Sequence, residues 1–328
     1  MITIGTGPLP HGADPELDAV EEQLLRLDPT GDQVARVIRD TLDQLYDGQH
    51  TGRWNYEQLH KTEKTHMGTL VEINLHRQFR FDDGEVTDYR IAGVDVDCKY
   101  SMAYGGWELP PEVIDCICLF ITANDAASSW AAGLLRVRES YLRGKPNRDA
   151  KRRLTAASRP RIRHLWPGHG KLDENLFLHL DDETRKRIFG AKARRGRLHG
   201  QAKTNELFRS VQRRIIRRPE LATVAQQDDF MKRARGNGGA RTQLRPEGIL
   251  VLGHQENDPL VAAALGLAVP KKGEFISARV VPARNDHDGP VAVILGKPWA
   301  LAQPGDPLSA APRYQGKISP DSQHNRTT

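Results

Sequence analysis

Two short β-prone segments separated by one Ala-Gly pair constrain the fold of this chain more than any other feature. The runs 86–91 and 94–100 flank the pair at 92–93, and strands joined by two such residues predict a tight β-hairpin. In that pairing Asp88 lies directly opposite Asp97, with Cβ atoms roughly 5 Å apart. The pattern therefore predicts a sheet that brings two carboxylates together.

The second strand of this hairpin alternates charged and apolar side chains. Because successive side chains point to opposite faces of a strand, each set shares one face. The charged set is Asp95, Asp97 and Lys99, and the apolar set is Val94, Val96 and Cys98. We expect the apolar face to pack into the core and the charged face to open into a site.

The opposed carboxylates of Asp88 and Asp97 repel each other unless a cation neutralises them. Ligation by a few carboxylate oxygens suits Mg²⁺ best. Lys99 would lie beside that cation, where it can orient or deprotonate an attacking water or balance charge on a phosphate. These residues predict a metal-dependent phosphodiesterase site.

A further acid, Glu72, lies on a predicted helix over 65–79. Apolar residues at near-helical spacing support this helix; they are Met67, Leu70, Val71, Leu75 and Phe79. Glu72 lies next to this stripe, so its carboxylate is expected at the edge of the site.

An acid-x-Lys triplet is equally compatible with a solvated, charged strand. The chain contains a second triplet, at 149–151, in a loop rich in Pro, Asn and Arg where nothing else indicates a site. A catalytic interpretation of 97–99 is favoured by the combination of Asp88, the apolar alternation and the upstream Glu72.

The composition agrees with about two globular domains. The chain has 328 residues, of which 38% are hydrophobic, enough for a core in each domain. No apolar run approaches the roughly 20 residues that span a membrane, and the N-terminus lacks the features of a secretory signal. Cys98, Cys116 and Cys118 match no zinc pattern, so we expect a reducing cytoplasm.

Positive charge is concentrated between residues 184 and 241. This segment holds 17 Lys/Arg and 4 Asp/Glu, a net charge of +13, whereas the whole chain has +6. Such a concentration predicts a polyanionic partner, most often nucleic acid, and a solvated helical surface is the alternative. A helix over 201–218, ended by Pro219, would bury one face and offer cations from another. The predicted DNA-contacting residues are Arg194, Arg195, Arg197, Lys203, Arg209, Arg213, Arg214, Arg217, Lys232 and Arg233.

The elements around that helix predict a winged helix-turn-helix domain. Helices are expected over 183–195, capped by Asp181 or Asp182, and over 220–235. A glycine-rich loop and a strand at 248–253 follow. Helices followed by a loop and strands are typical of winged-helix DNA-binding domains.

The chain as a whole predicts a mixed α/β (α+β) protein. Further helices are expected over 15–27, 31–46 and 129–138, with a buried run over 113–122. The predicted boundaries are a flexible N-terminus at 1–12, a catalytic domain at 13–164, a linker at 165–173, a DNA-binding domain at 174–304 and a disordered tail at 305–328.

Four segments closely resemble the NaeI-type (type IIE) restriction endonucleases, and the resemblance extends over nearly the whole chain. They are DTLDQLYDGQ (40–49), GTLVEINLHR (68–77), VDCK (96–99) and AQQDDFMKR (225–233). The resemblance implies an N-terminal nuclease domain of the PD-(D/E)xK superfamily, with a central mixed sheet flanked by helices. It implies a C-terminal winged-helix domain similar to that of catabolite activator protein.

On this resemblance the active-site positions are Glu72, Asp88, Asp97 and Lys99. Asp88 and Asp97 would ligate Mg²⁺, and Glu72 would complete the acidic site directly or through water. Thr87 stands where a proline often precedes the first acid. The resemblance also implies a homodimer that holds two copies of duplex DNA, one cleaved and one acting as effector. A GC-rich palindrome such as GCCGGC, cut to blunt ends, is the implied target.

The same family has a known likeness to DNA ligases, which falls on Leu45, Tyr46, Asp47 and Gly48. Leu45 stands where a ligase has its nucleotidyl lysine. Because leucine forms no phosphoramide bond, ligase activity is not expected. A helix end closed by an Asp-Gly turn explains these residues locally.

The sequence therefore predicts a type II, two-site-activated restriction endonuclease that hydrolyses duplex DNA with Mg²⁺. Two alternatives remain. One is a non-catalytic DNA-binding regulator whose nuclease-like domain is structural. The other is a strand-passing enzyme with a covalent intermediate, which would need an exposed nucleophile such as Tyr46.

Overall fold

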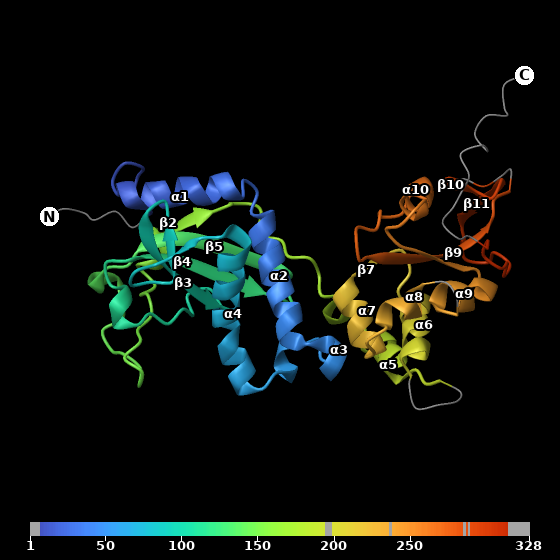
Figure 1. Cartoon of the computed structure of the whole chain (residues 1–328), viewed down its shortest axis with the longest axis horizontal. Helices are drawn as coiled ribbons and strands as arrows, with labels where there is room; N and C mark the ends of the chain where they lie inside the picture. Colours follow the sequence, from blue (N-terminus) through green and yellow to red (C-terminus); the bar gives the residue numbers. More distant parts are fainter. Residues whose placement is uncertain (1–6, 194–198, 236–237, 285–286, 288, 314–328) are drawn as a thin grey trace, which may run out of the picture. The chain divides into compact units, whose positions relative to one another are not determined.

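The chain divides into two compact units, each of which is described by itself (Figure 1). The computed structural model describes residues 7–193, 199–235, 238–284, 287 and 289–313. The first unit comprises Met1–Tyr46 and Asn55–His179, and the second comprises Asp47–Trp54 and Leu180–Thr328. A short segment from the first half of the sequence thus belongs to the second unit.

A six-stranded mixed sheet forms the centre of the first unit. Its strands follow the order β1-β2-β3-β4-β5-β6. The β3–β4 pair is parallel and the other neighbours are antiparallel. The bounds are β1 Asp82–Asp83, β2 Tyr89–Ile91, β3 Val94–Ser101, β4 Ile117–Asn124, β5 Ser129–Arg136 and β6 Arg163–Leu165. The predicted mixed α/β class is confirmed.

Three long helices accompany this sheet. They are α1 Pro15–Leu27, α2 Asp32–Tyr46 and α4 Lys61–Phe79. The start of α1 is set locally, because the side chain of Asp14 caps the backbone N–H of Leu17 at 3.2 Å and proline occupies the first turn. Short 3₁₀ turns lie at η1 Tyr56–Gln58, η2 Pro111–Val113, η3 Glu139–Tyr141, η4 Arg159–Arg161 and η5 Leu176–His179.

The sheet is buried on both faces by different parts of the chain. On one face α1, α2 and α4 pack against Val96, Cys98 and Leu119. On the other face a layer of loops packs against Cys118 and Phe120. Leu109, Val113, Leu142, Leu154 and Ile162 belong to this second layer, which we call the loop-side core. Because side chains alternate along β3, Asp97 and Lys99 point to the loop side.

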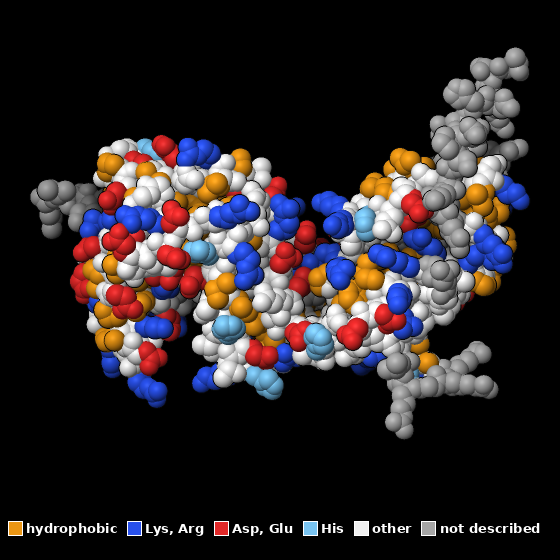
Figure 2. Space-filling view, in the orientation of Figure 1, with side chains coloured by type: hydrophobic (Ala, Val, Ile, Leu, Met, Phe, Trp, Pro, Cys, Tyr) orange, Lys and Arg blue, Asp and Glu red, His pale blue; other side chains and the backbone are white. Residues whose placement is uncertain are grey.

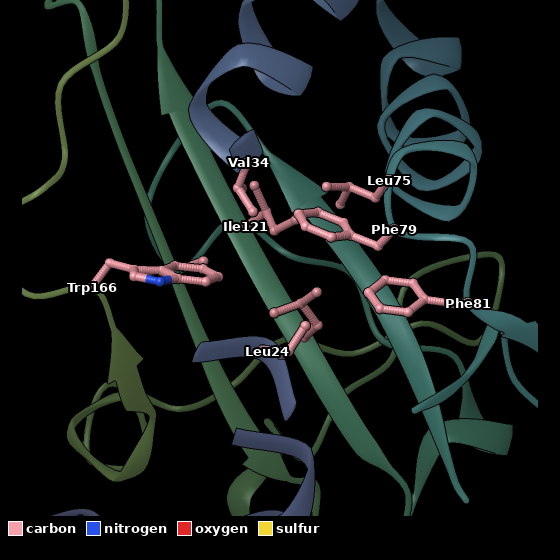
Figure 3. A pocket seen from close by; sticks show the side chains of 9 residues that line it. Leu24, Val34, Leu75, Phe79, Phe81, Ile121 and Trp166 are labelled. Atoms are coloured by element: carbon pink, nitrogen blue, oxygen red, sulfur yellow. The ribbon is translucent and has the colours of Figure 1, made fainter. Parts of the chain in front are cut away.

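The helix-side core contains a small apolar pocket (Figure 3). Its volume is about 10 Å³, and its lining comes from helices, strands and the segment after β6. The lining residues are Leu24, Val34, Leu75, Phe79, Phe81, Leu119, Ile121, Ala132 and Trp166. The lining carries no polar partner for a ligand, so this pocket is a packing gap and not a candidate site.

The helix predicted over 129–138 is wrong, because this segment is the strand β5. It pairs with β4 from Ile117↔Arg136 to Asn124↔Ser129. Its side chains alternate between the two cores, with Leu134 on the helix side and Leu135 on the loop side. Burial between two layers outweighs the helix preference of its alanines and leucines.

The linker predicted at 165–173 is also wrong. Leu165 ends β6, and both Leu165 and Trp166 are buried in the helix-side core. The indole Nε1 of Trp166 donates to the carbonyl of Asp28 at 2.5 Å. The Pro-Gly pair makes a turn within the first unit, whose last residue is His179.

Both predicted flexible ends are partly ordered. At the N-terminus the carbonyl of Leu9 accepts from Arg163 at 3.0 Å, and the N–H of Gly12 donates to Asp18 at 2.7 Å. Near the C-terminus Ala311 is buried and donates to the carbonyl of Arg245 at 2.9 Å. Residues 1–6 and 314–328 lie outside the described residues.

The second unit combines short helices with a five-stranded sheet. Its helices are α3 Gly48–Thr51, α5 Asp182–Gly190, α6 Gly200–Ser210, α7 Arg218–Ala225, α8 Phe230–Ala234, α9 Ala240–Gln243, the 3₁₀ turn η6 Arg245–Glu247 and α10 Asp258–Ala264. Its strands are β7 Ile215–Ile216, β8 Ile249–Leu252, β9 Phe275–Pro282, β10 Val291–Ile294 and β11 Lys297–Leu301. The order is β10-β11-β9-β7, and β8 also pairs with β9.

The long helices predicted in this unit are interrupted. The helix over 201–218 ends at Ser210, and Arg213 has a φ of 61°. Pro219 lies in the first turn of α7, where its missing N–H costs nothing, so it starts a helix instead of ending one. The helix predicted over 220–235 divides into α7 and α8 because Gln226 has a φ of 49°.

Acidic and basic side chains are interspersed over the visible face of the first unit (Figure 2). Among the described residues, no helix is long and apolar enough to cross a lipid bilayer.

The helix predicted over 183–195 is α5, which Asp181 caps as expected, and it ends at Gly190.

Candidate active site

The predicted β-hairpin is present and positions the acids. Tyr89 pairs with Val96 and Ile91 pairs with Val94, as predicted. The turn residues Ala92 and Gly93 have φ values of 52° and 79°, the left-handed pair that a two-residue hairpin turn requires. The local pattern thus sets the strand register without help from the rest of the chain.

The predicted direct pairing of Asp88 with Asp97 differs from the structure. The ladder ends at Tyr89, so Asp88 lies one residue beyond the strand. Its carboxylate Oδ2 accepts the backbone N–H of Cys98 at 2.6 Å. The two acids are still brought together, because both flank Lys99.

Lys99 joins the two carboxylates. Its Nζ lies 2.6 Å from Oδ2 of Asp97 and 4.0 Å from Oδ2 of Asp88. Burial lowers the pKa of Lys99, but the neighbouring Asp97 carboxylate outweighs burial, and the net pKa is raised. Lys99 is therefore a fixed ammonium group between two acids.

Asp97 is a buried carboxylate, only 5% exposed. Burial raises its pKa to about 6, although the ammonium of Lys99 acts in the opposite direction. On the neighbouring parallel strand β4, the thiol of Cys118 lies 3.6 Å from its Oδ2. No sequence pattern indicates this contact, since it depends on the β3–β4 pairing.

Glu72 comes from the middle of α4. The phenol of Tyr89 donates to the carbonyl of Glu72 at 2.8 Å, which ties α4 to β2. Burial raises the pKa of Glu72, and the negative charge of Asp88 raises it further. The Glu72 carboxylate therefore interacts electrostatically with the acid pair. The carboxylates of Glu72, Asp88 and Asp97 do not all lie within 4.8 Å of one another.

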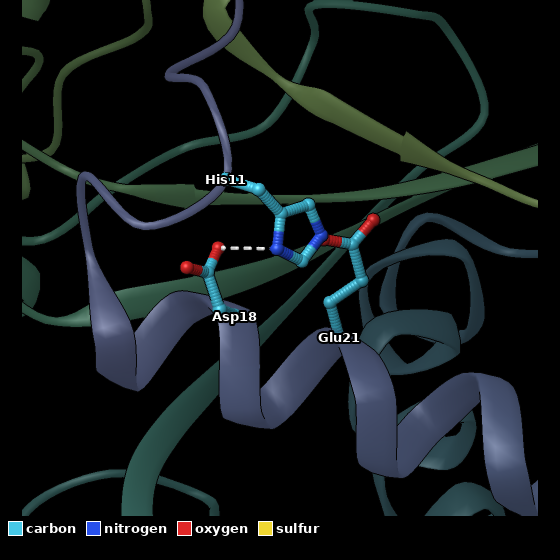
Figure 4. A group of neighbouring side chains, drawn as sticks. All are labelled: His11, Asp18 and Glu21. Atoms are coloured by element: carbon cyan, nitrogen blue, oxygen red, sulfur yellow. Dashed lines mark ion pairs between the residues drawn. The ribbon is translucent and has the colours of Figure 1, made fainter.

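A second cluster of potential ligands lies at the start of the chain (Figure 4). Atoms of His11, Asp18 and Glu21 lie within 4.8 Å of one another. A guanidinium nitrogen of Arg163 already contacts Asp18 at 2.5 Å and Glu21 at 2.7 Å. Because Arg163 already pairs with both acids, the cluster is an ion-pair network that holds the N-terminal segment onto α1.

The ligase-like segment has a structural explanation, as the local interpretation predicted. Leu45 is buried at the end of α2, and Asp47 adopts a left-handed φ of 46°. A Cβ on Gly48 would lie 1.9 Å from Oγ1 of Thr223, so only glycine fits between α3 and α7. Tyr46 is buried and donates to Asp125 at 2.6 Å, and it is therefore not the exposed nucleophile that a strand-passing enzyme would need.

Among the predicted DNA-contacting cations that the structure describes, most have partners within the second unit. Arg213 donates to the carbonyl of Ala302 at 2.8 Å. The other pairs are Arg209 with Glu206 and Glu247, Arg217 with Glu220, Arg233 with Asp229, and Lys203 with Gln226. Lys232 is exposed and Arg214 is half-buried. Arg194, Arg195 and Arg197 lie outside the described residues.

The mixed sheet and its acid–lysine cluster are consistent with a nuclease-like fold, and comparison with known proteins agrees. A sequence model described as "Restriction endonuclease NaeI" matches residues 18–310. The chain is 61% identical over 299 residues to the type II restriction enzyme NaeI of Lentzea aerocolonigenes, covering 91% of this chain and 94% of that protein. The protein is thus an enzyme of the restriction endonuclease class. More narrowly, the chain belongs to the NaeI restriction endonuclease family, and the resemblance read from the sequence is confirmed.

Proposed function

We propose that this protein is a type II, two-site-activated restriction endonuclease that hydrolyses phosphodiester bonds of duplex DNA with Mg²⁺. One observation carries the proposal. A buried carboxylate, Asp97, and a second acid, Asp88, flank the ammonium of Lys99 at 2.6 and 4.0 Å. The chain that carries this cluster is 61% identical to a type II restriction enzyme.

The donor set fits Mg²⁺. Oδ2 of Asp97 contacts Lys99, and Oδ2 of Asp88 accepts from the backbone, while the second oxygen of each carboxylate has no hydrogen-bond partner among the described residues. Two carboxylate oxygens completed by water are a typical Mg²⁺ environment. We assign Asp88 and Asp97 as direct ligands. Glu72 would act through a water molecule, because the three acids do not converge within 4.8 Å.

The residues have distinct roles in this proposal. Mg²⁺ bound there would supply Lewis-acid stabilisation of the charge that develops on the phosphate. The ammonium of Lys99 orients the attacking water and balances charge on the phosphate oxygens. Water attacks phosphorus in line with the departing 3′ oxygen, which leaves a 5′-phosphate and a 3′-hydroxyl.

The second unit supports a winged-helix assignment. Helix α6 is followed by β7, then by α7, α8 and α9, and then by β8, α10 and β9. Strands β7 and β8 both pair with β9. Helices before a small antiparallel sheet with this order match the winged-helix arrangement that the resemblance implies, in which a helix enters the major groove.

The family resemblance extends the proposal to the oligomeric state of the protein and to its DNA target sequence. We propose a homodimer that holds two DNA duplexes, one cleaved and one acting as effector. A GC-rich palindrome such as GCCGGC is the proposed site, cut to blunt ends. The non-catalytic regulator is the competing hypothesis, and no feature of the structure favours it.

Cleavage of supercoiled plasmids of known sequence, in Mg²⁺ or EDTA, tests the proposal. We expect discrete bands in Mg²⁺ that an added site-bearing duplex stimulates, and none with Asp97→Asn. Asp149→Asn is the matched control, because it changes the acid of the other acid-x-Lys triplet. Binding without cleavage by the wild-type protein under every metal tested would reject the nuclease and favour the regulator.

A further inference from the structure

A projecting loop of the first unit, residues 143–151, is distinct from every site described above. An antiparallel bridge between Leu142 and Leu154 closes its base. At its tip the side chain of Asn147 accepts the backbone N–H groups of Asp149 and Lys151 at 3.0 and 2.9 Å. The loop therefore has a defined shape, and in Figure 1 this light green segment extends away from the sheet.

The loop concentrates positive charge that has little internal compensation. It contains Arg143, Lys145, Arg148 and Lys151 and one acid, Asp149. Within the described part of the chain, neither Arg143 nor Lys145 has an ion-pair partner, and the Arg148 side chain, 98% exposed, reaches Asp149 only at 4.0 Å. Figure 2 shows Lys and Arg side chains gathered at this projection.

The cations just beyond the loop behave differently. Arg152 forms a bidentate salt bridge with Glu139, with N···O distances of 2.6 and 2.7 Å, and Arg153 pairs with Glu108 at 2.8 Å. The base of the loop is thus neutralised by acids from neighbouring segments, while its tip is not. A charge pattern of this kind leaves the tip free for an external anion.

The loop rises from the same side of the sheet as the catalytic cluster. Leu142 and Leu154, which close its base, belong to the loop-side core together with Cys118. The thiol of Cys118 contacts Asp97. A polyanion with a phosphate at Asp97 and Lys99 would therefore share this side of the sheet with the loop.

We propose that this loop binds the sugar-phosphate backbone of the duplex being cleaved, with Arg143 and Lys145 as its phosphate contacts. The inference rests on the proposed function, and it assigns DNA contacts to the catalytic unit in addition to the basic second unit. Flexible, exposed cations of this kind read charge and not base sequence. They strengthen binding of the duplex to the same extent before and during the reaction, without acting on the reacting atoms.

The test compares the salt dependence of DNA binding between matched variants. The double variant Arg143→Gln/Lys145→Gln removes two loop cations from the full-length protein. The control Arg26→Gln/Arg36→Gln removes two exposed cations from α1 and α2, on the other side of the sheet. Binding to linearised plasmid is measured in EDTA over a range of salt concentrations. We expect the slope of log K against log salt to fall by about 1.8 for the loop variant, since each lost phosphate contact removes about 0.9, and to be unchanged for the control.

Two further readouts separate a DNA contact from a structural role. The charge-preserving variant Arg143→Lys/Lys145→Arg should retain the wild-type slope, and all variants should keep the wild-type thermal midpoint. In plasmid cleavage the loop variant should raise KM with an unchanged rate at saturating DNA, because the contact is made equally before and during the reaction.

A wild-type slope for the loop variant, or an equal loss in the control, would overturn the proposal. So would failure of the charge-preserving variant to restore the slope. Absence of cleavage by the wild-type protein rejects the nuclease function instead, and the slope comparison still decides whether the loop binds DNA.

Discussion

The two acid-x-Lys triplets of this chain are the same motif in opposite environments. Asp97 and Lys99 lie on a central strand, buried between two layers, with a second acid across the lysine. Asp149 and Lys151 lie at a loop tip, where the acid is exposed and its neighbours are organised by Asn147. The first has the raised carboxyl pKa of a desolvated site, and the motif alone does not distinguish them.

Burial by itself does not create a reactive acid, as Asp125 shows. This residue is 2% exposed, yet it accepts hydrogen bonds from Arg39, Tyr46 and Asn175. Burial acts to raise its pKa, but the Arg39 guanidinium outweighs burial and the net pKa is lowered. Asp97 has a comparable burial with fewer donors, and that difference leaves it an available carboxylate oxygen.

The largest expected contrast is between the two lysines. Lys99→Ala should lower the plasmid cleavage rate by about 10²- to 10³-fold, the usual loss when a group that stabilises developing charge is removed. Lys151→Ala should leave the rate at saturating DNA within about twofold. Single-turnover cleavage in Mg²⁺ measures both, and equal losses would contradict the assignment of the site to 97–99.

A smaller effect, on stability, is expected at Asp125. Asp125→Asn leaves the buried Arg39 guanidinium with Asp43 as its remaining carboxylate partner, so the free energy of unfolding at neutral pH should fall by about 3 kcal/mol. Urea unfolding measures this loss, with Asp149→Asn as the exposed control, expected within about 0.5 kcal/mol of wild type. Similar losses in both variants would show that the buried network of Asp125 stabilises the fold no more than an exposed carboxylate does.

The same network predicts a pH dependence. Because the folded-state pKa of Asp125 lies below its ordinary value of 3.8, its contribution to stability is complete above about that pH and is lost as the pH falls through the folded pKa. The stability difference between wild type and Asp125→Asn should therefore shrink in acid. A difference that stays constant from neutral pH to below 3 would contradict the lowered pKa.

The smallest effect is expected at the loop tip. Asn147→Ala removes two hydrogen bonds from backbone N–H groups and one from its own amide to Glu108, in an exposed loop where water replaces them, so the unfolding free energy should fall by only about 1 kcal/mol. The cleavage rate at saturating DNA should be unchanged, because neither Asn147 nor the neighbouring triplet at 149–151 takes part in the reaction. A large loss of rate in single-turnover cleavage would instead link the loop tip to the reacting atoms.

Several parts of the fold could be predicted because they depend on neighbours in the sequence. The helix over 15–27 follows from its Asp14 cap and its proline, and the β2–β3 register follows from the Ala-Gly turn and the alternation of β3. Glu72, Asp97 and Lys99 were found from such local patterns together with the family resemblance. The Asp-Gly closure after α2 is local in the same sense.

Predictions failed where partners distant in sequence decided the outcome. Residues 129–136 are a strand because β4 and β6 flank them, and Leu165 and Trp166 are core because the helices cover them. Arg209 of the basic segment also pairs with Glu247, which lies outside that segment, and a charge count does not reveal this pairing.

By itself the sequence determined the helix over 15–27, the hairpin register and the choice of candidate acids and lysine, since turn chemistry, caps and side-chain alternation act within a few residues. Only the tertiary structure decided which acid-x-Lys triplet is buried, how Asp88 turns from Asp97 to the backbone of Cys98, and which cations remain unpaired. Desolvation and ion pairing depend on the layers that close over a residue, and those layers come from segments far apart in the chain.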